Sequence, residues 1–350
     1  MIKKDGLFLF FYRLFASFAI KYVFLISDRM KRLLLLVLWV WVACFTAASH
    51  NYMFKHLEVK DGLSNNQVNA IYKDSHGFMW FGTASGLNRY DGYDTRIYRS
   101  LKDDGNSLPD SYIEDIQEDA TGNLWVRTGA GYAIYNSVSD IFDRNVEGWM
   151  WHIGISGNPS TVYIDSEKIF WIYVAGKGIY CYKPGQENAV MVAGTDTLLT
   201  EMNITDMTEC SEGILLAFGN GVLACLDREK LNVKWTFDGI ASQWGKNQSE
   251  TFTLFVDSHE RVWMYSVEGM WVYHLPKKSW EVRSVRSDRS NMVRAISQDK
   301  YGNIWIGRDQ DGIEVIGLDG ESVRLMNDPN NERTISNNTV TVLYEDNVGT

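Results

Sequence analysis

The candidate ligand-binding side chains lie at positions where one copy of an internal sequence repeat differs from the other copies. Arg127 and Arg308 occupy places that hold glycine or threonine in related segments, and Asp309 follows Arg308. A guanidinium can hold a carboxylate or sulfate through two parallel hydrogen bonds. Tyrosine and tryptophan offer a flat face and a polar edge, which suit a sugar ring. The predicted ligand-binding residues are Arg127, Arg308, Asp309, Tyr173, Tyr265, Trp149, Trp151 and Trp244. The alternative is that these side chains only pack between structural repeats.

No arrangement of residues predicts catalysis. The six histidines are scattered along the chain, and His76 and His259 fall within turn motifs. Recurring aspartates could form acid–base pairs, but their fixed position in each repeat indicates a role in turns. The sequence has no phosphate-binding glycine loop and no metal-ligand spacing. We therefore expect a binding protein with no catalytic residues, no cofactor and no metal.

Composition narrows the function classes. The 350 residues carry a formal net charge of −10, and 45% of them are hydrophobic. Lysine and arginine do not cluster beyond the N-terminal region, so nucleic-acid binding, which needs clustered cations, is not expected. Outside the leader stand three cysteines, none in a C-x-x-C pair, which argues against zinc or redox chemistry. One disulfide among them stays an open alternative. These cysteines are Cys181, Cys210 and Cys225.

Residues 30–49 have the form of a secretory signal peptide. A basic pair, Lys31 and Arg32, precedes an apolar run and then small residues. The run from Leu33 to Phe45 is shorter than the about 20 residues that span a bilayer. An uncleaved membrane-anchor helix and a lipoprotein site at Cys44 are the alternatives. Residues 1–29 contain a second apolar stretch, so we expect Met30 to be the true start and 1–29 to be upstream or mis-assigned sequence.

One repeat fills residues 50–350. Its centre is an anchor tryptophan that follows a glycine by three residues and an aspartate by six, and consecutive anchors are 42 to 47 residues apart. In the fourth of six copies, Leu216 replaces the tryptophan and Cys210 the aspartate. The residues that define the repeat are Asp74, Gly77, Trp80, Asp119, Gly122, Trp125, Asp165, Trp171, Asp257, Trp263, Asp299, Gly302 and Trp305.

The repeat predicts four short strands. Asp-x-x-Gly is a tight turn between antiparallel strands, because the aspartate accepts backbone hydrogen bonds and glycine tolerates positive φ. Apolar residues flank each anchor, so the strand that carries it is buried on both faces. A later glycine marks the turn into a third strand. Such units stack radially as the blades of a β-propeller. The predicted fold is an all-β propeller; a solenoid of strands is the alternative.

We expect six four-stranded blades and the first strand of a seventh, an incomplete seven-bladed ring preceded by a helical signal or anchor segment. The turn Asp346–Gly349 places the next anchor near position 352. Residues 339–345 would be the first strand of that blade, and residues 52–58 its outer strand. We therefore expect a fragment, which extension by roughly 30 residues would stabilise by covering strand edges. The predicted blades are about 62–100, 107–143, 155–183, 202–237, 248–283, 290–325 and, in part, 336–350.

Residues 62–71 and 77–92 resemble the two-component regulator propeller repeat. The resemblance covers residues 52–350 and is weakest in the third and fourth copies. It implies the N-terminal, periplasmic sensor region of a hybrid two-component sensor histidine kinase/response regulator of the Bacteroidetes type. A second propeller, a membrane helix, a kinase, a receiver and a DNA-binding domain would follow. The implied ligand is an oligosaccharide, the implied output is control of glycan-utilisation genes, and the implied signalling unit is a homodimer in the inner membrane.

Two other functions stay open. A secreted propeller could serve as a protein-binding or structural module, with membrane contact only through the leader or a downstream helix. An enzymatic propeller is the weaker alternative. Residues 119–125 are similar to the motif of streptogramin-lyase propellers, but that family continues with Thr-Glu where this chain has Arg127 and Thr128. The sialidase Asp-box has a different spacing of aspartate, glycine and aromatic residue.

Overall fold

Each copy of the repeat folds as one four-stranded antiparallel sheet, with strands paired in chain order. The first two blades are β1 (Val68–Lys73), β2 (Met79–Thr83), β3 (Gly86–Tyr90), β4 (Thr95–Tyr98), and β5 (Ile113–Glu118), β6 (Leu124–Thr128), β7 (Gly131–Asn136), β8 (Ile141–Asp143). The third and fourth are β9 (Thr161–Ile164), β10 (Phe170–Val174), β11 (Gly178–Tyr182), β12 (Val190–Met191), and β13 (Ile204–Cys210), β14 (Gly213–Phe218), β15 (Leu223–Asp227), β16 (Asn232–Phe237). The fifth and sixth are β17 (Thr253–Val256), β18 (Arg261–Ser266), β19 (Gly269–His274), β20 (Ser279–Val285), and β21 (Val293–Gln298), β22 (Ile304–Arg308), β23 (Ile313–Ile316), β24 (Ser322–Leu325). The predicted propeller of six four-stranded blades is confirmed.

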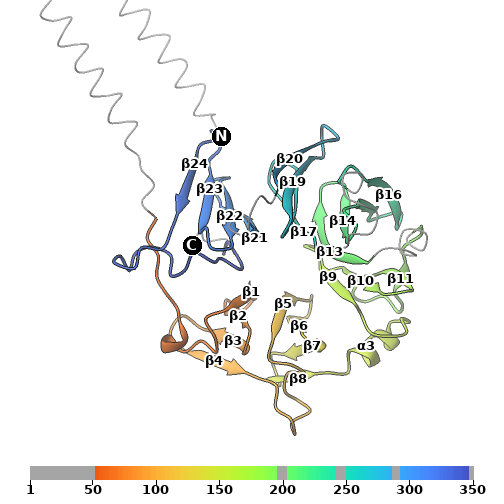
Figure 1. Cartoon of the computed structure of the whole chain (residues 1–350). Coiled ribbons are helices and arrows are strands. Elements are labelled where there is room, and N and C mark those ends of the chain that lie inside the picture. The colour runs from red at the N-terminus through yellow and green to blue at the C-terminus, as the bar shows by residue number, and fades with distance from the viewer. Residues whose placement is uncertain (1–51, 195–202, 241–249, 286–291, 347–350) are drawn as a thin grey trace, which may run out of the picture. The chain divides into compact units, whose positions relative to one another are not determined.

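The computed structural model describes residues 52–194, 203–240, 250–285 and 292–346. The leader at 30–49 and Trp244 lie outside these residues. Within them, no helix has the length and apolar character needed to cross a membrane. Residues from Phe54 onward form one compact unit, in which the first strand of each blade faces the axis of the ring and the fourth strand lies outside (Figure 1).

The repeat aspartate binds two kinds of donor at once. Oδ1 of Asp74 accepts hydrogen bonds from the backbone N–H groups of His76 and Phe78, at 3.0 and 2.9 Å. Oδ2 accepts the indole N–H of the anchor Trp80 at 2.7 Å. The same indole bond measures 3.3, 3.0, 2.8 and 3.0 Å in the second, third, fifth and sixth blades. The fourth blade lacks both partners, which indicates that aspartate and tryptophan act as a pair.

Two blades make this turn without glycine. Gly77 has a φ of 91°, and the equivalent Lys168 and Glu260 adopt φ values of 64° and 60°. Side chains with a Cβ rarely take this left-handed conformation, which costs about 1 kcal/mol or more. The turn is thus set by the aspartate and the strand pairing, and glycine only eases it.

Side chains on these turns tie neighbouring blades together. Glu118, which ends β5, accepts hydrogen bonds from the Ser75 hydroxyl and backbone N–H in the turn of the first blade, at 2.6 and 3.1 Å. Glu209 of the fourth blade likewise accepts hydrogen bonds from the backbone N–H and the hydroxyl of Ser166 in the third blade. Gln298 of the sixth blade accepts the backbone N–H of Ser258 in the fifth. The boundaries between blades 1 and 2, 3 and 4, and 5 and 6 are linked in this way.

Two local features differ from the sequence-based expectation. The fourth strand of the third blade, Val190–Met191, lies beyond the predicted end of that blade at 183. A short helix, α3 (Val146–His152), joins the second and third blades where no helix was predicted. Its cap is Asn145, whose side chain accepts the Gly148 N–H at 3.0 Å. Seven residues are too few to show a helical period, so the pattern could not indicate this helix.

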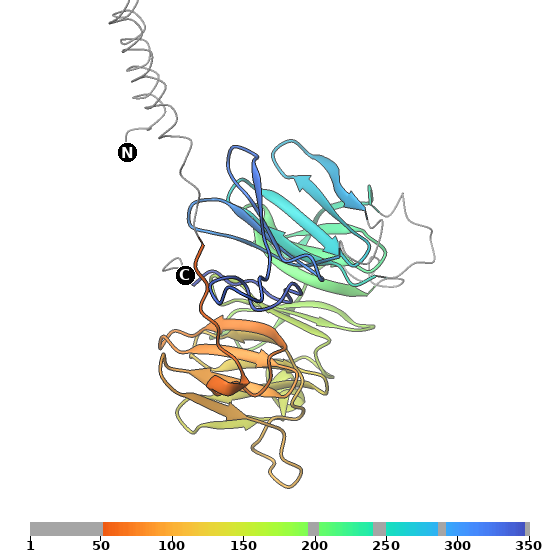
Figure 2. The same ribbon diagram turned by 60° about the vertical axis from the view of Figure 1, so that its left-hand side comes forward.

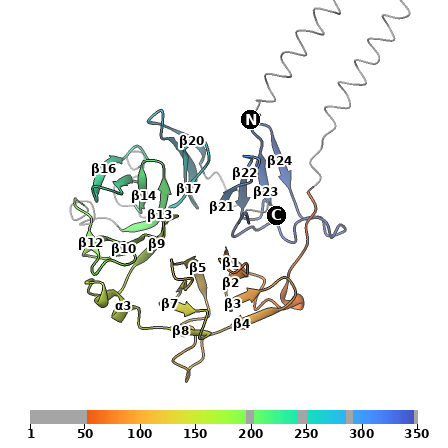
Figure 3. The same ribbon diagram turned by 180° about the vertical axis from the view of Figure 1, so that it is seen from behind.

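Residues 326–346 lie between the sixth and the first blade in each view (Figure 1, Figure 2, Figure 3). The backbone N–H of Val340 donates to Arg308 O at 3.0 Å, and the Thr341 hydroxyl donates to Val68 O at 2.5 Å. The N-terminal segment meets the same region, since Phe54 N donates to Arg333 O at 3.2 Å. Residues 336–346 and 52–58 contain no regular strand, because isolated bonds do not form a ladder. The strands of a seventh blade stay a prediction.

Candidate functional site

Four of the predicted ligand-binding residues stand near the ends of second strands. Arg127 pairs with Asp115, Tyr173 with Thr161, Tyr265 with Thr253 and Arg308 with Val293, close to the start of each inner strand. All blades repeat one topology, so these residues share one face of the ring. We call it the upper face, and we call the face that carries the Asp-x-x-Gly turns the lower face.

Arg127 lies in a cluster of charged side chains on the upper face. Its Nε is 2.9 Å from Oε2 of Glu114, and its guanidinium also bonds to Tyr132. Glu114 is the extra residue of a β-bulge, between Ile113 and Asp115, in the innermost strand of the blade. A bulge bends the strand and re-aims a side chain. About a third of the Arg127 side chain, 32%, is exposed to solvent.

Asp206 of the fourth blade interacts with this cluster. Its Oδ2 accepts the Leu254 N–H at 2.8 Å and its Oδ1 the Met207 N–H at 2.9 Å. Burial raises the pKa of Asp206 to about 7 in spite of these bonds, and the charge of Asp115 raises it further while Arg127 lowers it. The effects of Asp115 and Arg127 on this pKa are smaller than the effect of burial. Burial and the charge of Asp206 also hold the pKa of Tyr265, in the fifth blade, above its usual range.

Asp206 should make stability depend on pH. Its pKa is about 7 when folded and about 4 when unfolded, so between these values the folded state keeps a proton that the unfolded state releases. The free energy of unfolding should therefore fall as pH rises from about 4 to about 7, with no further change from this group above that. In Asp206→Asn this fall should disappear. Urea unfolding of both proteins at several pH values measures it; equal slopes would show that Asp206 does not titrate in this range.

The other predicted residues are more enclosed. Tyr173 is 3% exposed, and its hydroxyl donates to Asn203 Oδ1 at 3.4 Å. Arg308 is 5% exposed and pairs with Glu314 at 2.6 Å. Asp309 pairs with Arg294 at 2.9 Å, and that guanidinium holds the pKa of Asp309 below its usual value. In this structure, a ligand would reach Arg127 more readily than Tyr173 or Arg308.

The two described tryptophans of the predicted set lie apart from the cluster, on α3. Trp149 packs edge-on against the anchor Trp125, with ring centroids 4.6 Å apart, and against Phe170. Trp151, two residues later, is 74% exposed. Trp149 thus belongs to the hydrophobic core between the second and third blades, and Trp151 faces solvent.

Sequence reasoning missed the acidic members of the cluster, Glu114, Asp115 and Asp206. A signal was present ten residues before each anchor, where Asp115 and Asp206 replace small or neutral residues. The full set at that position is Ala70, Asp115, Thr161, Asp206, Thr253 and Ala295. The cluster offers several carboxylate acceptors and one guanidinium donor, an arrangement that can bind hydroxyl groups. In the described part of the chain, no three His, Cys, Asp or Glu side chains are placed to hold a metal ion.

Three segments of the chain, residues 62–85, 107–130 and 287–307, match the two-component regulator propeller family. These three segments are similar to two-component regulator propeller repeats. The matches fall on the first, second and sixth blades of the propeller, which we call the regulator propeller after them. Asp206, Tyr173 and Tyr265 belong to the three blades between them, which depart most from the repeat.

Known proteins resemble the regulator propeller over different lengths. Histidine kinase P4 of Formosa agariphila is 40% identical over 62 residues, which are 18% of this chain and 4% of that protein. The extracellular domain of BT3049 from B. thetaiotaomicron, named as a hybrid two-component system, has a TM-score of 0.65 over 85% of this chain at 18% identity. This chain covers 40% of that domain. Virginiamycin B lyase of Staphylococcus aureus has a TM-score of 0.52 at 10% identity, over 75% of this chain and 85% of the lyase. Identities this low show a shared fold alone.

Proposed function

We propose that the regulator propeller is the periplasmic ligand-sensing part of a hybrid two-component signalling protein of the inner membrane, and that it senses an oligosaccharide. The repeat family and the similarity to an extracellular domain of a protein named as a hybrid two-component system support the sensor role. The match to a histidine kinase supports a kinase elsewhere in the full-length protein. On this proposal the described propeller binds and carries out no catalysis.

The observation that carries the ligand class is the upper-face cluster. Carboxylates of Glu114, Asp115 and Asp206 can accept hydrogen bonds from sugar hydroxyls, and Arg127 can donate to a ring or glycosidic oxygen. Arg127 is already paired with Glu114 at 2.9 Å, and acids outnumber arginine around it. An acidic ligand would have to displace that pairing and approach like charges. A neutral oligosaccharide therefore fits the cluster better than an acidic one.

The signal would pass from this site to the rest of the sensor. Arg127, Glu114 and Asp115 belong to the second blade and Asp206 belongs to the fourth. A ligand that contacts both groups would therefore change how these two blades are placed relative to each other. In a homodimer, such a change would alter how two propellers face each other and so regulate the kinase and, through it, glycan-utilisation genes. Ligand binding can shift the sensor between two such arrangements only by its differential affinity for the two states.

Arg127→Ala tests the site. Loss of a charge-assisted hydrogen bond should weaken oligosaccharide binding by about 1.5–3 kcal/mol, roughly 10- to 100-fold. Isothermal titration of the chain with neutral and acidic oligosaccharides measures affinity. Arg96→Ala is the matched control, because Arg96 lies on the outer strand β4 and pairs with Asp140. Equal loss in both variants, or tighter binding of acidic sugars, would contradict the proposal. Arg308→Ala should chiefly lower stability, since that side chain is buried.

A protein-binding module is the second candidate. The exposed Trp151 on α3 favours it, because aromatic side chains are enriched at protein interfaces. Trp151→Ala should leave oligosaccharide binding unchanged if the first proposal holds. If no oligosaccharide binds and Trp151→Ala abolishes association of the extracellular region with itself in sedimentation experiments, the second candidate replaces it.

A further inference from the structure

A cavity lies on the lower face, between the fifth and sixth blades, whereas Arg127 lies on the upper face of the second blade. Its volume is about 450 Å³. The fifth blade contributes the start of β18 and the turn from β19 to β20, and the sixth contributes its Asp-x-x-Gly turn and the turn from β23 to β24. The tie between Ser258 and Gln298 adjoins it. We call this cavity the blade 5–6 pocket.

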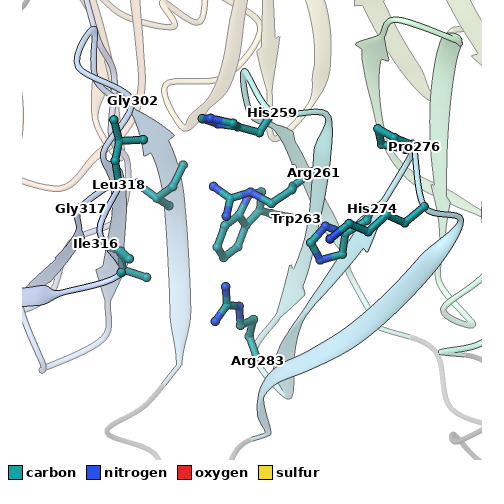
Figure 4. Close-up of a pocket in the computed structure, with 13 residues that line it drawn as sticks. His259, Arg261, Trp263, His274, Pro276, Arg283, Gly302, Ile316, Gly317 and Leu318 are labelled. Carbon is teal, nitrogen blue, oxygen red and sulfur yellow. The ribbon is translucent and has the colours of Figure 1, made fainter. Parts of the chain in front are cut away.

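Cationic side chains line the fifth-blade wall of the blade 5–6 pocket. Arg261, Lys277 and Arg283 carry formal positive charges, and His259 and His274 stand beside them. In Figure 4 the guanidinium groups of Arg261 and Arg283 extend into the space between the two blades. A concentration of cations in one pocket is notable in a chain whose net charge is −10.

Each arginine forms an ion pair with one carboxylate, in which Nε is the contacting nitrogen. Nε of Arg261 is 2.5 Å from Asp257 Oδ2, and Nε of Arg283 is 2.9 Å from Glu281 Oε1. Among the residues that the structure describes, neither arginine forms an ion pair with a second acidic residue, and Lys277 has no ion pair. A guanidinium can donate two parallel hydrogen bonds to an oxyanion.

Both guanidinium groups lie close to the same aromatic ring. Their guanidinium carbons lie 5.3 and 5.8 Å from the ring centroid of the anchor Trp263. Stacking on tryptophan is favourable and limits rotation of the planar group. The pocket therefore presents two guanidinium groups already in place, which lowers the entropy cost of binding.

The sixth-blade wall is aliphatic. Ile304, Ile316 and Leu318 line it, and Figure 4 shows Ile316 and Leu318 opposite the arginines. A bare inorganic ion would use only the cationic wall. A molecule with an anionic group and a carbon body would use both.

The fold does not require the charge of Arg261. Arg261 stands two residues before its anchor, and the other five copies have no cation there. Their residues are Phe78, Asn123, Ile169, Ile214 and Asn303. An arginine in only one of six equivalent places is a departure from the repeat, as expected for a binding residue.

We propose that the blade 5–6 pocket binds an organic anion, whose carboxylate or sulfate group is held by Arg261 and Arg283 and whose body lies on Ile316 and Leu318. The site is independent of the upper-face cluster. Benzoate, glucuronate, inorganic sulfate and glucose are the probes, titrated calorimetrically into the chain at low salt. Benzoate has an apolar body and glucuronate a hydroxylated one, so comparing their affinities shows which kind of body the pocket prefers. We expect at least one of the two to bind, and we expect glucose, which has no anionic group, not to bind.

Arg261→Gln and Arg283→Gln should each weaken binding of that probe by about 10- to 100-fold. Arg324→Gln is the matched control, because Arg324 is a similarly exposed arginine, paired with Asp311, on the outer strand of the sixth blade. Arg283 is 42% exposed, so its variant should fold even if Arg261→Gln does not. Binding of sulfate as tight as that of the organic probes, no binding of either organic probe, or retained affinity in Arg283→Gln would overturn the proposal. An unchanged affinity in Arg127→Ala would separate this pocket from the oligosaccharide site.

Discussion

Asp165→Ala is expected to lower the free energy of unfolding by roughly 3 kcal/mol, because it leaves several buried donors without an acceptor. The carboxylate of Asp165 is 2% exposed and accepts the N–H groups of Glu167, Ile169 and the Trp171 indole, at 3.0, 2.9 and 3.0 Å. For a domain of this size, the melting temperature should fall by on the order of 10 °C. Thermal unfolding followed by circular dichroism measures it.

Asp227→Ala is the matched control for this prediction. Asp227 caps a turn by accepting the N–H groups of Glu229 and Lys230, at 3.0 and 2.9 Å, but binds no indole, so its loss should destabilise the protein much less than the loss of Asp165. A double-mutant cycle with Trp171→Phe isolates the carboxylate–indole bond and should give an interaction energy of about 1 kcal/mol. Equal effects of the two alanine variants, with no coupling to Trp171, would show that the pair adds nothing to the turn.

Removal of residues 336–350 should be the second large effect. Residues 336–346 occupy the place of a next inner strand. A Cβ on Gly307 would lie 2.8 Å from Val340 Cγ1, as one on Gly82 would lie 2.5 Å from Ile113 Cγ2. Truncation also removes the bond from Gly312 N to Asn338 O, at 2.8 Å, and the ion pair of Lys73 with Asp346, at 3.6 Å. We expect a loss of roughly 4 kcal/mol, measured by urea unfolding.

A pair of point variants tests the same boundary without truncation. Val340→Asp places a carboxylate against Gly307 and should destabilise the propeller by about 2–3 kcal/mol. Val323→Asp makes the same chemical change on the outer strand β24, where Val323 is 55% exposed, and should have little effect. If the truncated chain and Val340→Asp are as stable as the unaltered chain, residues 336–346 do not close the sixth blade onto the first.

The architecture could be predicted because the repeat is dictated by local physics. A turn aspartate, a turn glycine and a buried tryptophan recur in fixed register, and each has one structural role that the sequence shows directly. The turn also forms in the two repeats that lack its glycine, where Lys168 and Glu260 take the left-handed conformation. The repeat pattern could not show that the aspartate also accepts a hydrogen bond from the anchor indole. Asp74 and Trp80 come together only when β1 and β2 pair.

The candidate site was predictable only in part. The frame places Arg127 at the end of a second strand, but its partner Glu114 depends on a β-bulge that shifts register by one residue. The effect of Asp115 on Asp206 depends on how the second and fourth blades are placed in the ring. The position of a residue within its own repeat does not give that placement. The cations of the blade 5–6 pocket come from Arg261, Lys277 and Arg283, on different strands and turns. Such groupings arise from the closed ring and not from the spacing in the chain.

Residues near both ends of the propeller contact each other: Phe54 N donates to Arg333 O at 3.2 Å, and His56 Nε2 lies 2.7 Å from Thr334 O. The arrangement of blades around the ring therefore does not depend on where the chain is opened. Apart from the charges around Asp206, the contacts between blades described above join neighbouring blades, so they do not depend on which blade comes first in the chain. A circular permutant that begins in the exposed loop 101–106, with a flexible linker from residue 346 to residue 54, would keep each blade boundary described above. Moving the termini in this way should leave the ligand-binding blades in the same positions around the ring.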